Sequence, residues 1–170
     1  MNARIRPVAA TDWGQIADIF NYYVIESLAA YPDQPVSEAF FRDRQGAHPE
    51  YPFVVAEAEE GVVGFAYLSP FHPARTMRHT ASLTYFLHPQ HTGRGIGTEL
   101  LEHLFDGGKS IGVTNFTAHI SSENPGSVRF HQKHGFTECG RFVNVGIKKG
   151  RRFDMVWMQR ELCESEGSGE

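Results

Sequence analysis

The chain of 170 residues lacks several features that mark specialised classes of protein. It contains only two cysteines, Cys139 and Cys163, so no disulfide framework is implied. No apolar run approaches the roughly 20 residues that a membrane-spanning helix needs. The first ten residues, MNARIRPVAA, lack the apolar core of a signal peptide. These absences lead us to expect a soluble, cytoplasmic protein.

An excess of charge of one sign is also absent. The formal net charge is −4, and the acidic segment 164–170 supplies three of the glutamates, so the rest of the chain is nearly neutral. A nearly neutral body argues against nucleic acid as the main partner. Apolar residues make up 41% of the chain, as in ordinary globular proteins. We therefore expect one domain over residues 1–163, followed by a disordered tail over residues 164–170.

The spacing of apolar residues predicts a mixed α/β fold. Helical spacing predicts four helices, at residues 12–27, 37–45, 98–107 and 127–134. Thr11 or Asp12 is the expected cap of the first helix, and Ser37 that of the second. Strands are predicted at residues 4–8, on both sides of a turn near Glu60, and at 79–87, 113–120, 136–147 and 153–162. The order β-α-α-β-β-β-α-β-α-β-β indicates a mixed sheet layered with helices.

Three glycines at alternate positions, in the segment TGRGIGT at 92–98, stand between a strand and a helix. This arrangement aims several backbone N–H groups and the positive end of the helix dipole at one point, where a pyrophosphate would fit. A P-loop is excluded because no lysine follows Gly97, and the spacing differs from the dinucleotide fingerprint. Taken alone, the glycines are also compatible with a turn that binds nothing.

A second motif makes the pattern specific. The segment TGRGIG resembles the coenzyme A loop of the GNAT acyltransferases. NPGSVRFHQKHGF, at 124–136, resembles the second signature of that family, in which an asparagine opens a helix that ends in Gly-Phe. The resemblance covers nearly the whole chain. Residues 78–80, 127–131 and 148–154 are similar to motifs of the phosphinothricin and methionine sulfone/sulfoximine N-acetyltransferases.

The resemblance implies a GNAT fold, with a mixed, mostly antiparallel sheet of about seven strands flanked by four helices. It implies acetyl-CoA as cosubstrate and no metal. The pantetheine arm would pair with the backbone of Tyr85, Phe86 and Leu87. The residues that would wrap the phosphates are Gly93, Arg94, Gly95, Ile96, Gly97 and Thr98. Asn124 would contact the cofactor from the next helix, and Lys133 is a further candidate.

Acetyl transfer to an amine needs a base for the ammonium, a donor for the thioester oxygen and a proton for the leaving thiolate. The resemblance implies that His131 is the acid that faces the thiolate. The alternative is a histidine that only packs or hydrogen bonds beside the cofactor. His134, three residues further, raises the possibility of a metal site, but no third ligand has suitable spacing.

Ser82 departs from the subgroup pattern, which has a glutamate here as the presumed general base. We assign Ser82 to the catalytic centre by position, although serine cannot take a proton at pH 7 without a partner. Three explanations stay open. A water chain relays the proton, another group such as His79 or Glu26 serves as the base, or catalysis has been lost.

The acceptor pocket is expected beside Arg75, Met77 and Arg78, because the two arginines would suit a substrate carboxylate. Both arginines are alternatively ordinary surface residues. The leading hypothesis is an N-acetyltransferase that moves acetyl from acetyl-CoA to a small amino-acid-like amine by direct attack. The resemblance suggests a homodimer. An acyl-CoA-binding protein with weak or lost catalysis and a peptide or protein N-acetyltransferase are the alternatives.

Overall fold

The computed structural model describes residues 3–162, so Cys163 and the expected tail at 164–170 lie outside it. Within these residues the α-helices are α1 (Trp13–Glu26), α2 (Glu38–Ala47), α3 (Ile96–Ser110) and α4 (Pro125–Lys133). The strands are β1 (Arg4–Pro7), β2 (Phe53–Ala58), β3 (Gly61–Pro70), β4 (Thr80–Leu87), β5 (Asn115–Ser121), β6 (Thr137–Lys148) and β7 (Arg151–Glu161). Two short 3-10 helices are η1 (Arg75–Met77) and η2 (Pro89–His91). The predicted order of helices and strands is confirmed.

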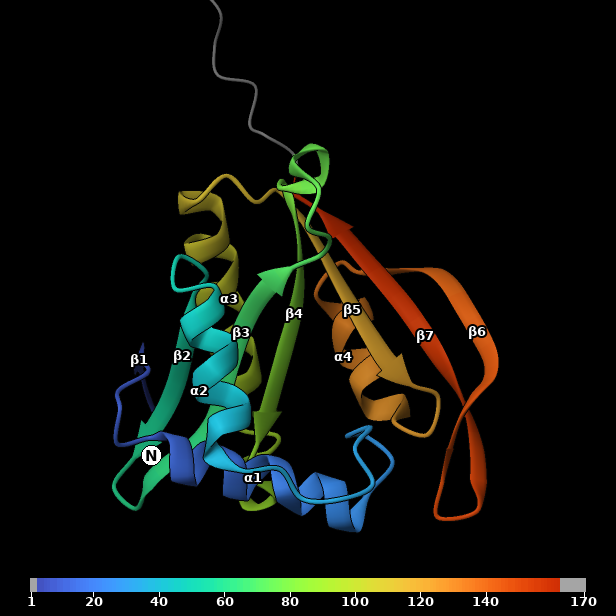
Figure 1. The fold of residues 1–170 in the computed structure, drawn as a ribbon, viewed down its shortest axis with the longest axis horizontal. Helices are drawn as coiled ribbons and strands as arrows, with labels where there is room; N and C mark the ends of the chain where they lie inside the picture. Colours follow the sequence, from blue (N-terminus) through green and yellow to red (C-terminus); the bar gives the residue numbers. More distant parts are fainter. Residues whose placement is uncertain (1–2, 163–170) are drawn as a thin grey trace, which may run out of the picture.

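The strands form one sheet in the order β1-β2-β3-β4-β5-β7-β6 (Figure 1). Its pairs are antiparallel except β4 with β5, which α3 connects as a crossover. The mixed, mostly antiparallel sheet of the prediction is therefore confirmed. The parallel pairing covers only three positions and ends where Ser82 faces Thr117. Beyond that point β4 and β5 separate, and the gap between them positions the site described below (Figure 1).

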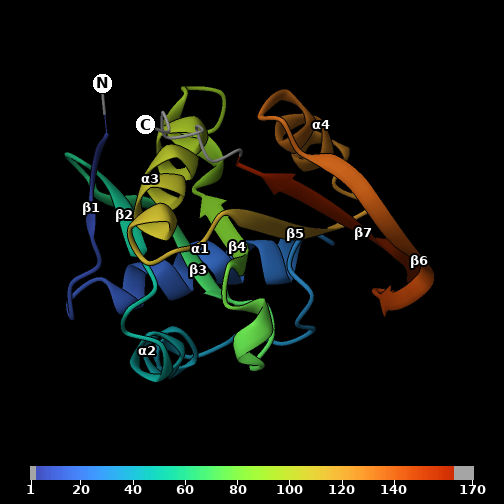
Figure 2. The ribbon, with the colours of Figure 1, turned by 90° about the horizontal axis from the view of Figure 1, so that it is seen from above.

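The two faces of the sheet carry separate apolar cores. Figure 2 shows α3 and α4 on one side of the sheet and α1 and α2 on the other. Leu83 of β4 belongs to the core beneath α3, whereas Phe86 packs into the core beneath α1 and α2. Successive side chains of a strand alternate between its faces. β4 therefore presents Tyr85 toward α4 and Ser82 and Thr84 toward α1.

The helices begin and end for identifiable reasons. α3 starts at Ile96, two residues before the predicted start, because Gly95 adopts a left-handed φ of 85° at the N-cap. α4 starts at Pro125 because the Asn124 side chain accepts a hydrogen bond from the Ser127 N–H at 3.2 Å. None of the helices within residues 3–162 is long and apolar enough to cross a bilayer.

Two residues that were predicted to cap helices lie at N-cap positions, but their side chains make no capping hydrogen bond. Asp12 and Ser37 precede α1 and α2, but neither side chain bonds to its helix. Asp12 instead accepts hydrogen bonds from the Arg6 guanidinium at 2.7 Å and the Ala9 N–H at 2.7 Å. The ion pair with Arg6 holds the pKa of Asp12 below its usual value. The Asp12 carboxylate, which the local sequence pattern assigned to the N-terminus of the helix, therefore pairs with a charged residue of β1 instead.

Candidate functional site

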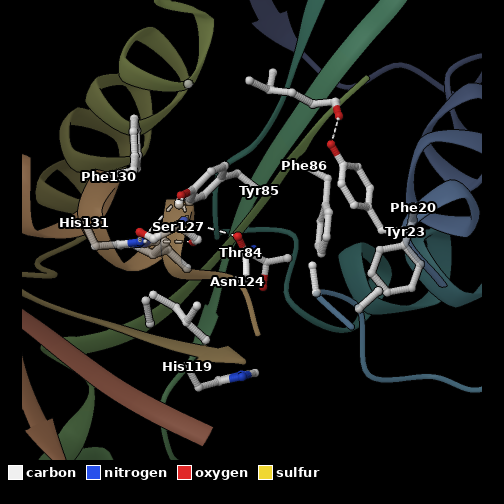
Figure 3. A pocket seen from close by; sticks show the side chains of 18 of the residues that line it. Phe20, Tyr23, Thr84, Tyr85, Phe86, His119, Asn124, Ser127, Phe130 and His131 are labelled. Carbon is white, nitrogen blue, oxygen red and sulfur yellow. Dashed lines mark hydrogen bonds between the residues drawn. The ribbon is translucent and has the colours of Figure 1, made fainter. Parts of the chain in front are cut away.

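A cavity of about 820 Å³ occupies the place where β4 and β5 separate. It extends from the glycine loop at the start of α3, past α4 and both strands, to α1 and α2. Figure 3 shows lining residues of β4, β5, α4 and α1 around it. The predicted site residues that line it are Ser82, Tyr85, Phe86, Leu87, Gly93, Gly95, Gly97, Thr98, Asn124, His131 and Lys133. These predicted residues come from three segments of the chain, 82–87, 93–98 and 124–133, which therefore share one site.

The edge of β4 that faces the cavity offers free backbone groups. The His88 N–H donates to the Val63 carbonyl at 2.8 Å, so the even-numbered residues of this strand bond to β3. In an antiparallel ladder the odd-numbered residues then face the opposite edge, which β5 no longer pairs beyond Ser82. The Leu87 carbonyl on that edge accepts from the Tyr23 hydroxyl at 2.6 Å (Figure 3). The backbone of Tyr85 remains available to an extended ligand, as in strand addition.

The glycine loop needs glycine for two reasons. Gly93 and Gly95 have φ values of 74° and 85°, in the left-handed region that side chains disfavour. A Cβ built on either would meet no protein atom within 4 Å, so the space above the loop is open. At Gly97, by contrast, a Cβ would lie 3.4 Å from the Phe130 ring. The first two glycines therefore leave room for a ligand, and the third lets α3 pack against α4.

The cavity end of this loop is suited to an anion. Among the first N–H groups of α3, those of Thr98 and Glu99 donate to the Gly95 carbonyl, whereas those of Ile96 and Gly97 make no backbone hydrogen bond within residues 3–162. The helix dipole adds positive potential there. Thr98 and Lys133 line the same end, and the Thr98 hydroxyl lies 3.0 Å from His134 Nε2. Arg94 is exposed and Ile96 is buried in the core, and neither lines the cavity. His134 Nδ1 lies 2.8 Å from the Phe130 carbonyl, so its Nε2 accepts the Thr98 hydroxyl proton, and the backbone N–H groups and Lys133 are left as the anion-facing groups.

His131 is buried on α4, with 2% of its surface exposed. Its Nδ1 lies 2.8 Å from the Ser127 carbonyl and 3.5 Å from the Tyr85 hydroxyl (Figure 3). Burial lowers the pKa of His131 to about 4, so the ring is neutral at pH 7. A neutral ring that donates from Nδ1 has an unprotonated Nε2, and this atom finds no partner among residues 3–162. In this arrangement His131 carries no spare proton at Nε2.

Tyr85 holds the proton that His131 lacks. Its hydroxyl lies 3.4 Å from the Ser127 hydroxyl, and burial raises the pKa of the phenol. The His131 Nδ1–H is donated to the Ser127 carbonyl at 2.8 Å, so the Tyr85 hydroxyl at 3.5 Å does not need to donate its proton to this ring. Sequence reasoning assigned only the backbone of Tyr85. The strand alternation that aims this side chain at α4 was the signal that could have found it.

Ser82 lies on the opposite face of β4, 3.0 Å from the Thr117 hydroxyl. Thr117 donates to the Ala81 carbonyl at 3.4 Å, so its oxygen accepts the Ser82 proton. The Ser82 oxygen therefore presents only its lone pairs to the cavity, and no basic group of the chain stands at this position. His79 and Glu26, which the sequence offered as substitutes, are both exposed and do not line the cavity.

The histidine that does line this part of the cavity is His119 of β5. Its ring packs against Tyr31 and Trp157, with centroids 5.5 Å and 5.1 Å away. This burial lowers its pKa. Sequence reasoning missed His119. The signal was present, because it follows Thr117 at the two-residue spacing of one strand face.

The arginine that lines the cavity is Arg44 of α2, not either of the predicted pair. Its guanidinium lies 4.9 Å from the centre of the Phe40 ring, and no carboxylate within residues 3–162 pairs with it. Phe40, Arg44 and Ser69 also line an adjoining cavity of about 460 Å³. Sequence reasoning overlooked Arg44, because nothing in the local pattern of α2 separates it from its exposed neighbours.

The structure does not bring the predicted substrate residues to either cavity. Arg75, Met77 and Arg78 lie on or directly after η1, and all three are exposed. Their role stays a prediction. In the part of the chain that the structure describes, His, Cys, Asp and Glu side chains form no group of three or more that could hold a metal ion.

Comparison with known proteins agrees with this geometry. A model of the acetyltransferase (GNAT) family matches residues 16–136. The L-amino acid N-acyltransferase MnaT of Escherichia coli K12 is 34% identical over 164 residues, which are 94% of each chain. Phosphinothricin N-acetyltransferase of Streptomyces viridochromogenes is 30% identical over 93% of this chain and 87% of that protein. The crystal structure of a Sinorhizobium meliloti phosphinothricin acetyltransferase in complex with acetyl-CoA has a TM-score of 0.89 at 33% identity, covering 99% of this chain and 93% of that one.

Proposed function

Because the chain belongs to the acetyltransferase (GNAT) family, we propose that it transfers acetyl from acetyl-CoA to the amine of a small amino-acid-like substrate. One observation carries the proposal. The anion-binding start of α3 and the unpaired edge of β4 open into the same cavity, which continues to a second region with its own cation and histidine. The relatives named for L-amino acid and phosphinothricin acylation support an amino-acid-like acceptor.

The described residues fit acetyl-CoA. Open space above Gly93 and Gly95, where a Cβ meets no protein atom, suits a pyrophosphate held by backbone N–H groups. Tyr85 and Leu87 offer the strand edge to the pantetheine arm, and Asn124 and Lys133 line the cavity beside them. When bound, acetyl-CoA supplies an activated acetyl thioester. The predicted cofactor residues Arg94 and Ile96 act through their backbone in this proposal, because their side chains point elsewhere.

The two faces of β4 divide the chemistry. On the α4 face, the Tyr85 hydroxyl holds the proton for the leaving sulfur. His131, neutral and bonded to the Ser127 carbonyl, orients that hydroxyl and is a positioning residue. On the α1 face, the lone pairs of Ser82 accept a hydrogen bond from the substrate amine. The amine and the sulfur thus approach the acetyl group from opposite faces of the strand.

Arg44 is the group that would select an acidic substrate. An unpaired guanidinium on a cavity wall binds a carboxylate through two parallel hydrogen bonds. Its stacking on Phe40 and Tyr67 limits its movement and keeps it at the wall. The adjoining cavity beyond Arg44 leaves room for a substrate side chain. Arg75, Met77 and Arg78 remain secondary candidates for contacts with the substrate.

We further propose a homodimer that covers β6. This strand is the edge of the sheet (Figure 2), and it exposes Phe142, Val143, Val145 and Ile147, each by more than half. A long apolar edge strand pairs or aggregates unless something covers it. A second copy of the chain, with the same strand, is the occupant we propose. The exposed free thiol of Cys139 suits the reducing conditions of the cytoplasm, where we place the protein.

A panel of amines tests the function. Purified full-length chain is mixed with acetyl-CoA and each amine, and release of free thiol is recorded. We expect turnover of compact L-amino acids and much weaker turnover of their methyl esters. If acetyl-CoA raises the melting temperature but no amine is acetylated, the acyl-CoA-binding alternative replaces this proposal. Turnover confined to peptide N-termini would instead support the peptide class.

A further inference from the structure

The amine must lose a proton before it attacks, and Ser82 stands where a carboxylate base is expected. We propose that His119 takes this proton, through Nε2, at the point where β4 and β5 separate. This assignment rests on the proposed function. It takes the place of His79 and Glu26, the two residues that the sequence offered as the base, since neither lines the cavity.

The sheet register places His119 beside the missing base. Ser82 faces Thr117 in the last paired position, and both hydroxyls lie on the same face of the sheet. Two residues further along each strand, Thr84 and His119 continue this face into the gap, and both line the cavity. Figure 3 shows His119 on the wall away from the Tyr85–Ser127–His131 cluster. The proton acceptor and the proton donor therefore lie on different sides of the reacting centre.

In this proposal His119 is the Nδ1–H tautomer, in which Nε2 accepts. Its Nδ1 lies 3.4 Å from the Tyr31 hydroxyl oxygen, and the two rings stack at 19°. When Nδ1–H donates to this oxygen, Nε2 is unprotonated, and it makes no hydrogen bond within residues 3–162. The same Nδ1–H bond stabilises the imidazolium after Nε2 has taken the proton. His119 is exposed and lines the cavity, and in the proposal the incoming amine reaches Nε2 from there.

The surroundings keep His119 neutral before the reaction. Packing against Tyr31 and Trp157 lowers the pKa of His119. Burial raises the pKa of Tyr31 to about 12, so the loop presents a neutral phenol. β4 presents only the hydroxyls of Ser82 and Thr84, and β7 presents Trp157.

Two cations belong to the wider surroundings of His119. β6 contributes Lys148, whose ammonium donates to the Ala30 carbonyl at 2.6 Å, next to Tyr31. α2 contributes Arg44 on the same cavity. Desolvation, and not either cation, is the cause that lowers the pKa of His119.

The proton balance is complete. Nε2 of His119 takes one proton from the substrate ammonium, and the freed lone pair of the nitrogen attacks the acetyl carbon. As the N–C bond forms, the C–S bond breaks and its electron pair leaves on sulfur, which takes the proton of the Tyr85 hydroxyl. The second amine proton returns through water to the Tyr85 oxygen. His119 releases its proton to solvent, so each turnover yields one proton.

His119→Asn in the full-length chain tests the assignment with an amine that the parent acetylates. We expect kcat to fall by roughly 10²-fold or more, with KM changed only a few-fold. The parent rate should fall as pH drops through the pKa of His119, and this acid limb should vanish in the variant. Stabilisation by acetyl-CoA should stay at the parent value, which shows that the variant is folded. His103→Asn is the matched control, because His103 lies exposed on α3 and lines neither cavity.

A second variant keeps the test decisive. His119→Ala leaves room for a small base, and added imidazole should restore part of the lost rate. A His119→Asn protein with parental kcat and an unchanged acid limb would overturn the assignment while leaving the proposed function intact. A parent that binds acetyl-CoA and acetylates no amine overturns the proposed function, and the base assignment with it.

Discussion

The hydroxyls of Ser82 on β4 and Thr117 on β5 lie 3.0 Å apart at the last position where these strands pair. One residue pair further, the strands have separated and the cavity begins. Position 82 is therefore the point at which a side chain can both reach the opening and remain anchored to β5. In the proposal, a base at position 82 and one at His119 would serve the same substrate amine, because both residues line this cavity.

The first prediction concerns whether a carboxylate at position 82 can replace His119 as the base. Ser82→Glu in the parent should change kcat by only a few-fold, because His119 already takes the proton. In the His119→Asn background the same change should raise kcat at least 10-fold, since a positioned carboxylate supplies the missing base. Ser82→Gln has the same size without the charge and should restore nothing. Steady-state rates of thiol release decide it, and equal rates for the Glu and Gln double variants would contradict the idea.

The second prediction compares two glycines of the same conformation. Gly95 and Gly150 have φ values of 85° and 72°, and a Cβ on either meets no protein atom within 4 Å. Alanine at each should therefore lower the free energy of unfolding by a similar amount, about 1 kcal/mol. Only Gly95 lines the cavity. Acetyl-CoA at 100 times its Kd should stabilise the parent and Gly150→Ala by about 2.7 kcal/mol, and Gly95→Ala clearly less. Denaturant titrations with and without ligand measure this, and equal stabilisation of both variants would reject the phosphate loop.

The third prediction tests Arg44 as the carboxylate partner. Arg44→Met should raise KM for an L-amino acid by roughly 10- to 100-fold, the loss of a charge-assisted hydrogen-bonded pair. KM for the corresponding decarboxylated amine should hardly change. Arg42→Met on the same helix is the control, because Arg42 pairs with Asp43 at 3.4 Å and lines neither cavity. A parental KM for the amino acid in Arg44→Met would move the carboxylate site elsewhere, with Arg75 and Arg78 as the next variants.

The fourth prediction follows from the burial of His131. The folded protein lowers the pKa of His131 to about 4, whereas the unfolded chain has the ordinary value near 6.5. Between these values the unfolded state binds more protons, so stability is full above about pH 6.5 and is lost as pH falls toward 4. The loss at pH 4 is about 3 kcal/mol from this residue. His131→Gln should flatten the pH dependence of unfolding free energy in this window. His119, which is also held neutral, is present in both proteins and cancels in the comparison.

The fifth prediction concerns assembly. Val145→Lys places a charge on the exposed edge of β6 and should convert the proposed dimer to a monomer at tens of micromolar. Light scattering measures the mass. Ile111→Lys is the control, since Ile111 is also an exposed apolar residue but is the C-cap of α3 and lies outside β6. A monomeric parent, or a Val145→Lys protein with the parental dimer mass, would rule out this interface.

The fold was predictable because its signals are local. Periods of two and of 3.6 residues set the order of strands and helices, and the glycines at 93, 95 and 97 marked the start of α3. Where prediction failed, a contact outside the helix had intervened. Asp12 turned from its helix to Arg6, and α3 continued past Gly107 because the next glycine lies against Phe116, with 2.9 Å to a built Cβ.

The sequence by itself determined the family signatures, the conformation of the glycine loop and the presence of serine, not glutamate, at position 82. Only the tertiary structure decided which side chains meet. Arg44, Tyr85 and His119 come from a helix and two strands that are far apart in the chain, and no local pattern records that they face one cavity. Protonation was also decided there, because the charge state of His131 depends on desolvation by residues that pack around it. The periodic spacing of apolar residues depends on neighbours in the chain, whereas burial and charge state depend on neighbours in space.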